Sequence, residues 1–185
     1  MILGEEGTLV TITVLRDGAA TDYTLKRAAV VVHNTETEVL DGHIGYISCA
    51  SFGSDTGALF LEGIMECDEL VDSWLVDLRG NSGGASESAV AALGAFVGPG
   101  WHMYLQDRAG YLYYYAYELP SATDKPAVLL VDDVSASATE AFAAGMRDLR
   151  GGLLVGNRTY GKGTAQVIFD GATDPELFGE DALKV

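Results

Sequence analysis

The stretch AVLLVDDVSASATEAFAAGMRDLR (residues 127–150) decides the fold, because it changes from a strand pattern to a helix pattern within a few residues. Residues 127–131 are all apolar and predict a buried strand, whereas residues 138–150 carry apolar side chains at helical spacing. Strand and helix patterns alternate in the same way through the central part of the chain. The sequence therefore predicts an α/β fold in which Ser137 lies at a turn between a strand and a helix.

The remaining elements extend outward from this stretch. Before it we expect a strand at 43–48, a helix from about 56 to 70, a strand at 74–78, a helix at 87–97 and a tyrosine-rich hairpin at 102–118. After it we expect strands at 153–156 and 164–169. Residues 8–15 and 23–25 predict a hairpin without a core of its own, and residues 33–41 are richer in polar side chains and are interpreted as a connection.

Composition narrows the possible functions. With 185 residues and 48% hydrophobic content, the chain is long and apolar enough to bury a core. The net charge of -16 argues against a nucleic acid or an anionic membrane surface as partner, because both require a basic surface. No apolar run approaches the roughly 20 residues of a membrane span, and no signal peptide opens the chain. We therefore expect a cytoplasmic protein, or one whose targeting segment has been removed.

Cysteine and histidine residues give no sign of a metal or redox site. Cys49 and Cys67 fall in a predicted strand and a predicted helix, without the spacing of a zinc site, and are expected to be buried thiols. His33, His43 and His102 are scattered without a partner at ligand spacing. The sequence thus predicts neither a metal nor another cofactor.

Ser137 allows two interpretations. A serine followed three residues later by Glu140 is an ordinary helix N-cap, but a serine at a strand-to-helix turn can also be a nucleophile beside the unpaired N–H groups of the helix start. Lys162 favours the nucleophile, because Gly161 and Gly163 place this lysine in a tight loop that can approach another element closely. An unperturbed lysine has a pKa near 10.4, so a base at neutral pH needs a downward shift of about three units.

A second serine fits a nucleophile pattern less well. Ser82 stands in a G-x-S-x-G sequence after a predicted strand, but the only histidine that follows it is His102. The neighbouring glycines have a better use, since the N–H of Gly83 or Gly84 can point at a substrate carbonyl oxygen. A plain tight turn remains the alternative.

Four blocks in order resemble the carboxyl-terminal processing peptidases, or tail-specific proteases, a family of serine peptidases with a Ser/Lys catalytic pair. The blocks are GYI with SF (45–52), DLRGNSGG (77–84), SASATE (135–140) and VG through GKG to Q (155–166). The resemblance implies that Ser137 is the nucleophile, Lys162 the general base and Gln166 the residue that orients the lysine. It also implies that Gly83 and Ala138 form the oxyanion hole.

The resemblance carries further expectations about the whole protein. It implies a ClpP/crotonase-like β/α spiral core at residues 31–185, truncated at its carboxyl end, and preceded at residues 1–30 by the last strands of a PDZ domain. It implies a peptide or protein substrate recognised near its C-terminus, an extracytoplasmic location, and leaves a homodimer open. The alternatives are a catalytically silent peptide-binding or scaffold domain of the same fold, which would leave this chain inactive, and a crotonase-like acyl-CoA enzyme.

Overall fold

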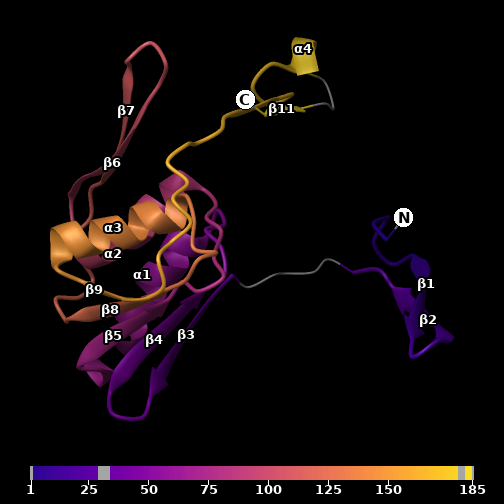
Figure 1. Ribbon diagram of the computed structural model, residues 1–185, viewed down its shortest axis with the longest axis horizontal. Helices are drawn as coiled ribbons and strands as arrows, with labels where there is room; N and C mark the ends of the chain where they lie inside the picture. The colour runs from indigo at the N-terminus through magenta and orange to yellow at the C-terminus, as the bar shows by residue number, and fades with distance from the viewer. Residues whose placement is uncertain (1, 29–33, 179–181, 185) are drawn as a thin grey trace. The chain divides into compact units, whose positions relative to one another are not determined.

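A five-stranded sheet forms the centre of the larger of two structural units in the computed structural model (Figure 1). The structure describes residues 2–28, 34–178 and 182–184, and the units divide between His33 and Asn34. The sheet has the order β3 (Thr35–Leu40), β4 (Ile44–Cys49), β5 (Ser73–Asp77), β8 (Ala127–Val131) and β9 (Leu153–Gly156). Strands β4, β5, β8 and β9 are parallel, and β3 pairs antiparallel with β4 at one edge.

Three helices connect the parallel strands and lie on the same side of the sheet (Figure 1). Helix α1 (Thr56–Cys67) joins β4 to β5 and ends in a short 3-10 turn, η1 (Asp68–Leu70), and α3 (Ala138–Arg150) joins β8 to β9. Helix α2 (Ser86–Val97) follows β5, and the hairpin of β6 (Gly100–Gln106) and β7 (Leu112–Tyr117) leads on to β8. Because parallel strands end at the same edge of a sheet, the turns that follow β5 and β8 meet there.

The core lies between the sheet and the helices. Alternate residues of β4, β5 and β8 are buried, as expected for strands that have one face covered. Five aromatic rings form a continuous cluster on this face, with centroids 5.6–6.4 Å apart: Phe52, Phe60, Trp74, Phe96 and Phe142. The cluster fixes α1, α2 and α3 against the sheet, and so fixes the position at which α3 begins.

The smaller unit contains one antiparallel hairpin of β1 (Leu9–Arg16) and β2 (Ala19–Lys26), paired in register from Leu9 with Lys26 to Arg16 with Ala19. Nearly all of its side chains are exposed, which confirms the prediction of a hairpin without its own core. Whether it is part of a PDZ domain stays a prediction.

Two sequence expectations about strands were wrong. Residues 35–40, interpreted as a connection, form β3, in which Glu36 and Glu38 face solvent at the sheet edge and protect it from pairing with other chains. Residues 164–167 form no strand, and the chain becomes a strand only at β10 (Ile168–Asp170), which pairs with β11 (Ala182–Lys184) after a short helix, α4 (Pro175–Phe178). No helix in the described part of the chain is long and apolar enough to cross a membrane.

Candidate active site

Asn81 ties together the turns that meet at the carboxyl edge of the sheet. Its side chain is completely buried, and its amide nitrogen donates to the Cys49 carbonyl oxygen at 2.9 Å. Its Oδ1 accepts hydrogen bonds from the Gly83 N–H at 2.9 Å and the Thr139 hydroxyl at 2.8 Å. The end of β4, the glycine turn after β5 and the first turn of α3 are therefore held by one side chain.

Ser137 has a strained backbone. Its φ of 58° and ψ of -120°, with the Thr139 N–H bonded to the Ala136 carbonyl at 3.1 Å, are those of the first central residue of a type II′ turn. Glycine is preferred at that position, and an ordinary N-cap serine would be extended. A non-glycine residue held in such a conformation points to function more than to capping.

Ser135, two residues earlier, has a structural role. Its hydroxyl is completely buried, donates to the Leu78 carbonyl oxygen at 2.9 Å and accepts the Asp132 N–H at 3.0 Å. Ser137 is half-buried and lines a cavity. Of the two serines in the block, the structure thus leaves Ser137 accessible to a substrate.

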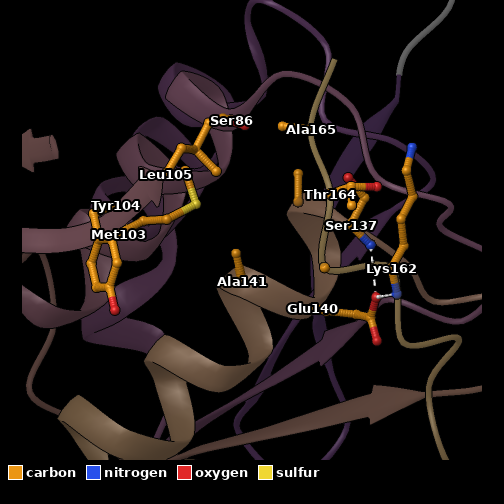
Figure 2. A pocket seen from close by; sticks show the side chains of 12 residues that line it. Ser86, Met103, Tyr104, Leu105, Ser137, Glu140, Ala141, Lys162, Thr164 and Ala165 are labelled. Atoms are coloured by element: carbon orange, nitrogen blue, oxygen red, sulfur yellow. Dashed lines mark hydrogen bonds between the residues drawn. The ribbon is translucent and has the colours of Figure 1, made fainter. Parts of the chain in front are cut away.

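Glu140 holds the lysine loop against the start of α3 (Figure 2). One carboxylate oxygen accepts the N–H groups of Ser137 at 2.9 Å and Lys162 at 2.8 Å, and the other accepts the Gly161 N–H at 2.7 Å. Partial burial raises the pKa of Glu140, but hydrogen bonds from the Thr159 side chain and these N–H groups outweigh it and hold the pKa below its ordinary value of 4.5.

This arrangement predicts that acid releases the loop. A carboxyl whose pKa is lowered on folding stabilises the folded state above its unfolded pKa of about 4.5, and the stabilisation is lost as the pH falls through the folded value. We expect hydrogen exchange of the Gly161 and Lys162 amides to accelerate below pH 4.5 beyond the intrinsic rate. Glu140→Gln should show faster exchange already at pH 7. Equal protection in the variant at pH 7 would contradict this role.

Lys162 places its amine away from the serine in this structure. The amine donates to Oε1 of Gln166 at 3.2 Å, and among the described residues it forms no hydrogen bond with the Ser137 hydroxyl. In Figure 2 the lysine side chain extends upward from the loop that Glu140 holds. Glu140 therefore anchors the backbone of the lysine beside that of Ser137, while Gln166 binds the end of its side chain.

The glycine turn approaches Ser137 very closely. A Cβ on Gly83, which has φ of 108°, would lie 2.9 Å from the Ser137 Cβ and 3.2 Å from the Ala138 nitrogen, so only glycine fits. The Ala138 N–H lies in the first turn of α3, where helix N–H groups lack helical acceptors. The Gly83 N–H, in contrast, is bonded to Asn81 and does not point into open space.

Two adjoining cavities collect the sequence-predicted residues. The first, of about 270 Å³, is bounded by Ser137, Ala138, Lys162 and side chains of β6 (Figure 2). The second, of about 760 Å³, includes Gly83, Gln166, Ser137 and Lys162. All five predicted site residues therefore line one connected depression, although they come from three separate segments of the chain.

Ser82 borders the same depression, but no histidine among the described residues hydrogen-bonds to it. Ser82 is exposed and lines the larger cavity, whereas the ring of His102 bonds to the Gly98 carbonyl at 2.8 Å, and His43 bonds to the Leu70 carbonyl at 3.1 Å. His33 lies outside the described residues. Within residues 2–28, 34–178 and 182–184, no group of three or more metal-ligating side chains comes together.

Both cysteines are free thiols, and Cys49 is buried as expected. Cys67 is only partly buried. Burial raises the pKa of the Cys49 thiol to about 11, despite hydrogen bonds that favour the thiolate. Cys49 is therefore an unreactive core residue at neutral pH.

Sequence reasoning missed the structural roles of Asn81 and Glu140. The sequence pattern indicates Glu140 only as a capping residue, whereas its carboxylate also binds a loop more than twenty positions further along the chain. The sequence pattern indicates no role for Asn81, which follows Gly80 and precedes Gly83 by two positions. A buried amide next to a glycine turn is a usable signal, because a buried amide needs several hydrogen-bond partners.

Comparison with known proteins points to one peptidase family. The model of peptidase family S41 matches residues 43–176. The chain is 32% identical over 169 residues to the carboxy-terminal processing protease CtpA of Bacillus subtilis (strain 168), covering 90% of this chain and 36% of that protein. It is 26% identical over 174 residues to the carboxyl-terminal-processing protease of Synechocystis sp. (strain ATCC 27184 / PCC 6803 / Kazusa), covering 90% of this chain and 41% of that protein.

A solved structure agrees with these relatives. The structure of a photosystem II D1 C-terminal processing protease superposes with a TM-score of 0.67 at 27% identity, over 90% of this chain and 48% of that one. The chain thus spans less than half the length of each of these proteins. The family model matches well over half of the chain, and the chain belongs to peptidase family S41.

Proposed function

We propose that this chain carries the catalytic centre of a serine endopeptidase of the C-terminal processing class. Ser137 attacks the carbonyl carbon of a peptide bond, and Lys162 accepts the hydroxyl proton and passes it to the leaving amine. Gln166 orients the lysine amine, and Gly83 and Ala138 stabilise the oxyanion. A water molecule then hydrolyses the ester bond to Ser137 and releases the second product.

The observation that carries the proposal is the strained backbone of Ser137 at the mouth of a cavity that Lys162 also lines. The type II′ conformation presents a serine side chain at the start of a helix, where the Ala138 N–H lies one residue away. A serine that merely capped the helix would gain nothing from a conformation that favours glycine.

Two adjustments connect the observed state with catalysis. The Lys162 amine, which Gln166 orients, moves within reach of the Ser137 hydroxyl, and the Gly83 peptide turns its N–H from Asn81 toward the substrate oxygen. Neither requires the backbone of α3 to move, because Glu140 already anchors both Ser137 and Lys162 through their N–H groups. Substrate binding supplies the differential interactions for such a change.

The finer fold and the setting of the whole protein are part of this proposal. The core belongs to the ClpP/crotonase-like type, residues 1–30 come from the end of a PDZ domain, and the full protein acts outside the cytoplasm on the C-terminal region of polypeptides. The names of the relatives, which are C-terminal processing proteases, support the substrate class. A homodimer remains compatible with the proposal.

Active-site labelling tests the chemistry directly. We expect a fluorophosphonate probe to label the wild-type chain covalently at Ser137, and Ser137→Ala to lose all labelling, with Ser135→Ala as the matched control for loss of a nearby serine. Because Ser135 stabilises the turn, its removal can lower the folded fraction. The labelling of Ser135→Ala is therefore compared with that of the wild type at equal folded fraction, measured by circular dichroism. Equal labelling of wild type and Ser137→Ala would overturn the assignment.

A catalytically silent peptide-binding domain is the second candidate. The bond from the Gly83 N–H to Asn81 favours it, since it engages a group that the oxyanion hole needs, and among the described residues the Lys162 amine forms no hydrogen bond with the Ser137 hydroxyl. Absence of probe labelling in the wild-type chain, together with retained binding of an unstructured peptide, would select this function.

A further inference from the structure

A third cavity lies along helix α3, beyond the candidate active site. Its volume is about 330 Å³, and it lies between β6 and the second half of α3. Trp101 and Tyr104 of β6 form one wall, and Ala144 and Leu149 lie on the helix side. None of the proposed catalytic residues borders it, so it has no part in the chemistry described above.

This cavity is continuous with the one beside Ser137. Met103, Tyr104 and Ala141 line both of them, so a single groove runs between β6 and α3. At one end the groove contains Ser137 and Ala138, and at the other it reaches Asp148 and Leu149. Continuity with the candidate catalytic pocket indicates that the same ligand occupies both.

The length of the groove follows from the helix. Eleven residues separate Ala138 from Leu149, which corresponds to about 16 Å along α3 at ~1.5 Å per residue. Ala144, the first residue of α3 that lines only the third cavity, lies about 9 Å from Ala138 by the same measure. An extended peptide advances ~3.3 Å per residue, so its third to fifth residues beyond the serine would lie in the third cavity.

The walls of this cavity favour apolar and aromatic side chains. The rings of Trp101 and Tyr104 both pack on Tyr114, with centroids 4.6 Å and 6.0 Å apart, and Trp101 is 72% exposed. Such preformed aromatic surface is rarely left exposed without a partner.

The polar groups at the cavity have partners already. Asp148 forms an ion pair with Arg147 at 2.6 Å, and His102 bonds to the Gly98 carbonyl. The small side chains of Ala141 and Ala144 leave space for a ligand on the helix side. The cavity thus matches a large apolar side chain better than a charged one.

We propose that the groove between β6 and α3 binds an extended segment of the substrate polypeptide. Its far cavity takes a large apolar or aromatic side chain three to five residues from the cleaved bond. The inference rests on the proposed function, because the ligand is taken to be the substrate of the peptidase. The far cavity would then determine substrate specificity. Trp101, Tyr104 and Ala144 are the residues that set the preference.

Binding to the Ser137→Ala protein tests the groove without cleavage. Fluorescein-labelled peptides of twelve residues, rich in Gly and Ser, carry either one Phe or one Asp at the same position, and their affinities are measured by fluorescence anisotropy. We expect the Phe peptide to bind about ten-fold more tightly, as is typical of one well-filled apolar pocket. Equal affinities of the two peptides would overturn the inference.

Variants in the same background locate the preference. Ala144→Trp fills the cavity and Tyr104→Ala removes part of its wall. Each variant should bring the ratio of the affinities for the Phe peptide and the Asp peptide close to one. Tyr111→Ala should leave the ratio unchanged, because Tyr111 is 70% exposed on the same hairpin and borders none of the three cavities. A ratio that persists in both Ala144→Trp and Tyr104→Ala would place the preference elsewhere and contradict the proposal.

Cleavage by the wild-type chain measures the register. Mass spectrometry of the products should place the cut bond three to five residues from the Phe, and a cut directly beside the Phe would contradict the assignment. Failure of the fluorophosphonate probe to label the wild type refutes the proposed protease function, whereas the anisotropy ratio still decides whether the groove binds peptide. The two failures are therefore distinguishable.

Discussion

Lys162→Met is expected to lower kcat for cleavage of an unstructured peptide by about a thousand-fold, a loss typical of a missing general base. Methionine has nearly the length of lysine but cannot accept a proton. The bonds that position the loop, from the Gly161 and Lys162 N–H groups to Glu140, involve only the backbone and remain. The substitution therefore removes the base without moving the segment that carries it, and KM should change little.

Two further lysine variants separate charge from basicity. Lys162→Arg keeps a positive charge but cannot act as a base at neutral pH, so it should be as inactive as Lys162→Met. Lys26→Met removes a lysine from the exposed strand β2 of the other structural unit and should retain wild-type kcat. Retention of more than a tenth of the activity in Lys162→Met would exclude Lys162 as the base.

Asn81→Ala is expected to destabilise the chain by about 3 kcal/mol and to lower the melting temperature by roughly 10 °C. The change leaves the Gly83 N–H, the Thr139 hydroxyl and the Cys49 carbonyl without the partner that now serves all three. These groups lie in the buried interior, where an unsatisfied polar group is costly. Thermal unfolding followed by circular dichroism measures the effect.

Thr139→Val is the matched control for this site. It keeps the shape of a buried side chain and removes only one of the hydrogen bonds to Asn81, so we expect a loss of about 1 kcal/mol. Asn81→Ala should also reduce kcat much more than Thr139→Val, because the Asn81 side chain also bonds to the Gly83 N–H of the glycine turn and to the end of β4, contacts that Thr139→Val leaves in place. Equal melting temperatures for Asn81→Ala and wild type would show that the turn is held by other contacts.

Local sequence patterns predicted the positions of Ser137 and the glycine turn in the fold, because a few consecutive residues determine that geometry. A buried strand that runs directly into a helix places the residue between them at the sheet edge, and Ser137 lies there. The glycine pattern left Gly83 and Gly84 both open as residues that need the absence of a Cβ, and the space beside Ser137 is too small for any side chain at Gly83. In both cases a few consecutive residues contain the whole signal.

Features that depend on distant partners could not be predicted in this way. The polar strand β3 exists because its backbone pairs with β4, and its sequence at a sheet edge carries little hydrophobic alternation. The bond from the Lys162 amine to Gln166 depends on side-chain torsions that no sequence pattern specifies. The Glu140 contacts require the loop at 161–162 to fold back over α3, which only the assembled sheet brings about.

The hydrogen bonds of Asn81 determine when the candidate site can assemble while the chain is being synthesised. They join residues 49, 81 and 139, which lie on three successive strand–helix units, so no shorter segment can complete the site. Contacts so far apart along the chain form late in folding. Under the proposed function, a nascent chain therefore contains Ser137 before the contacts that position it for catalysis have formed.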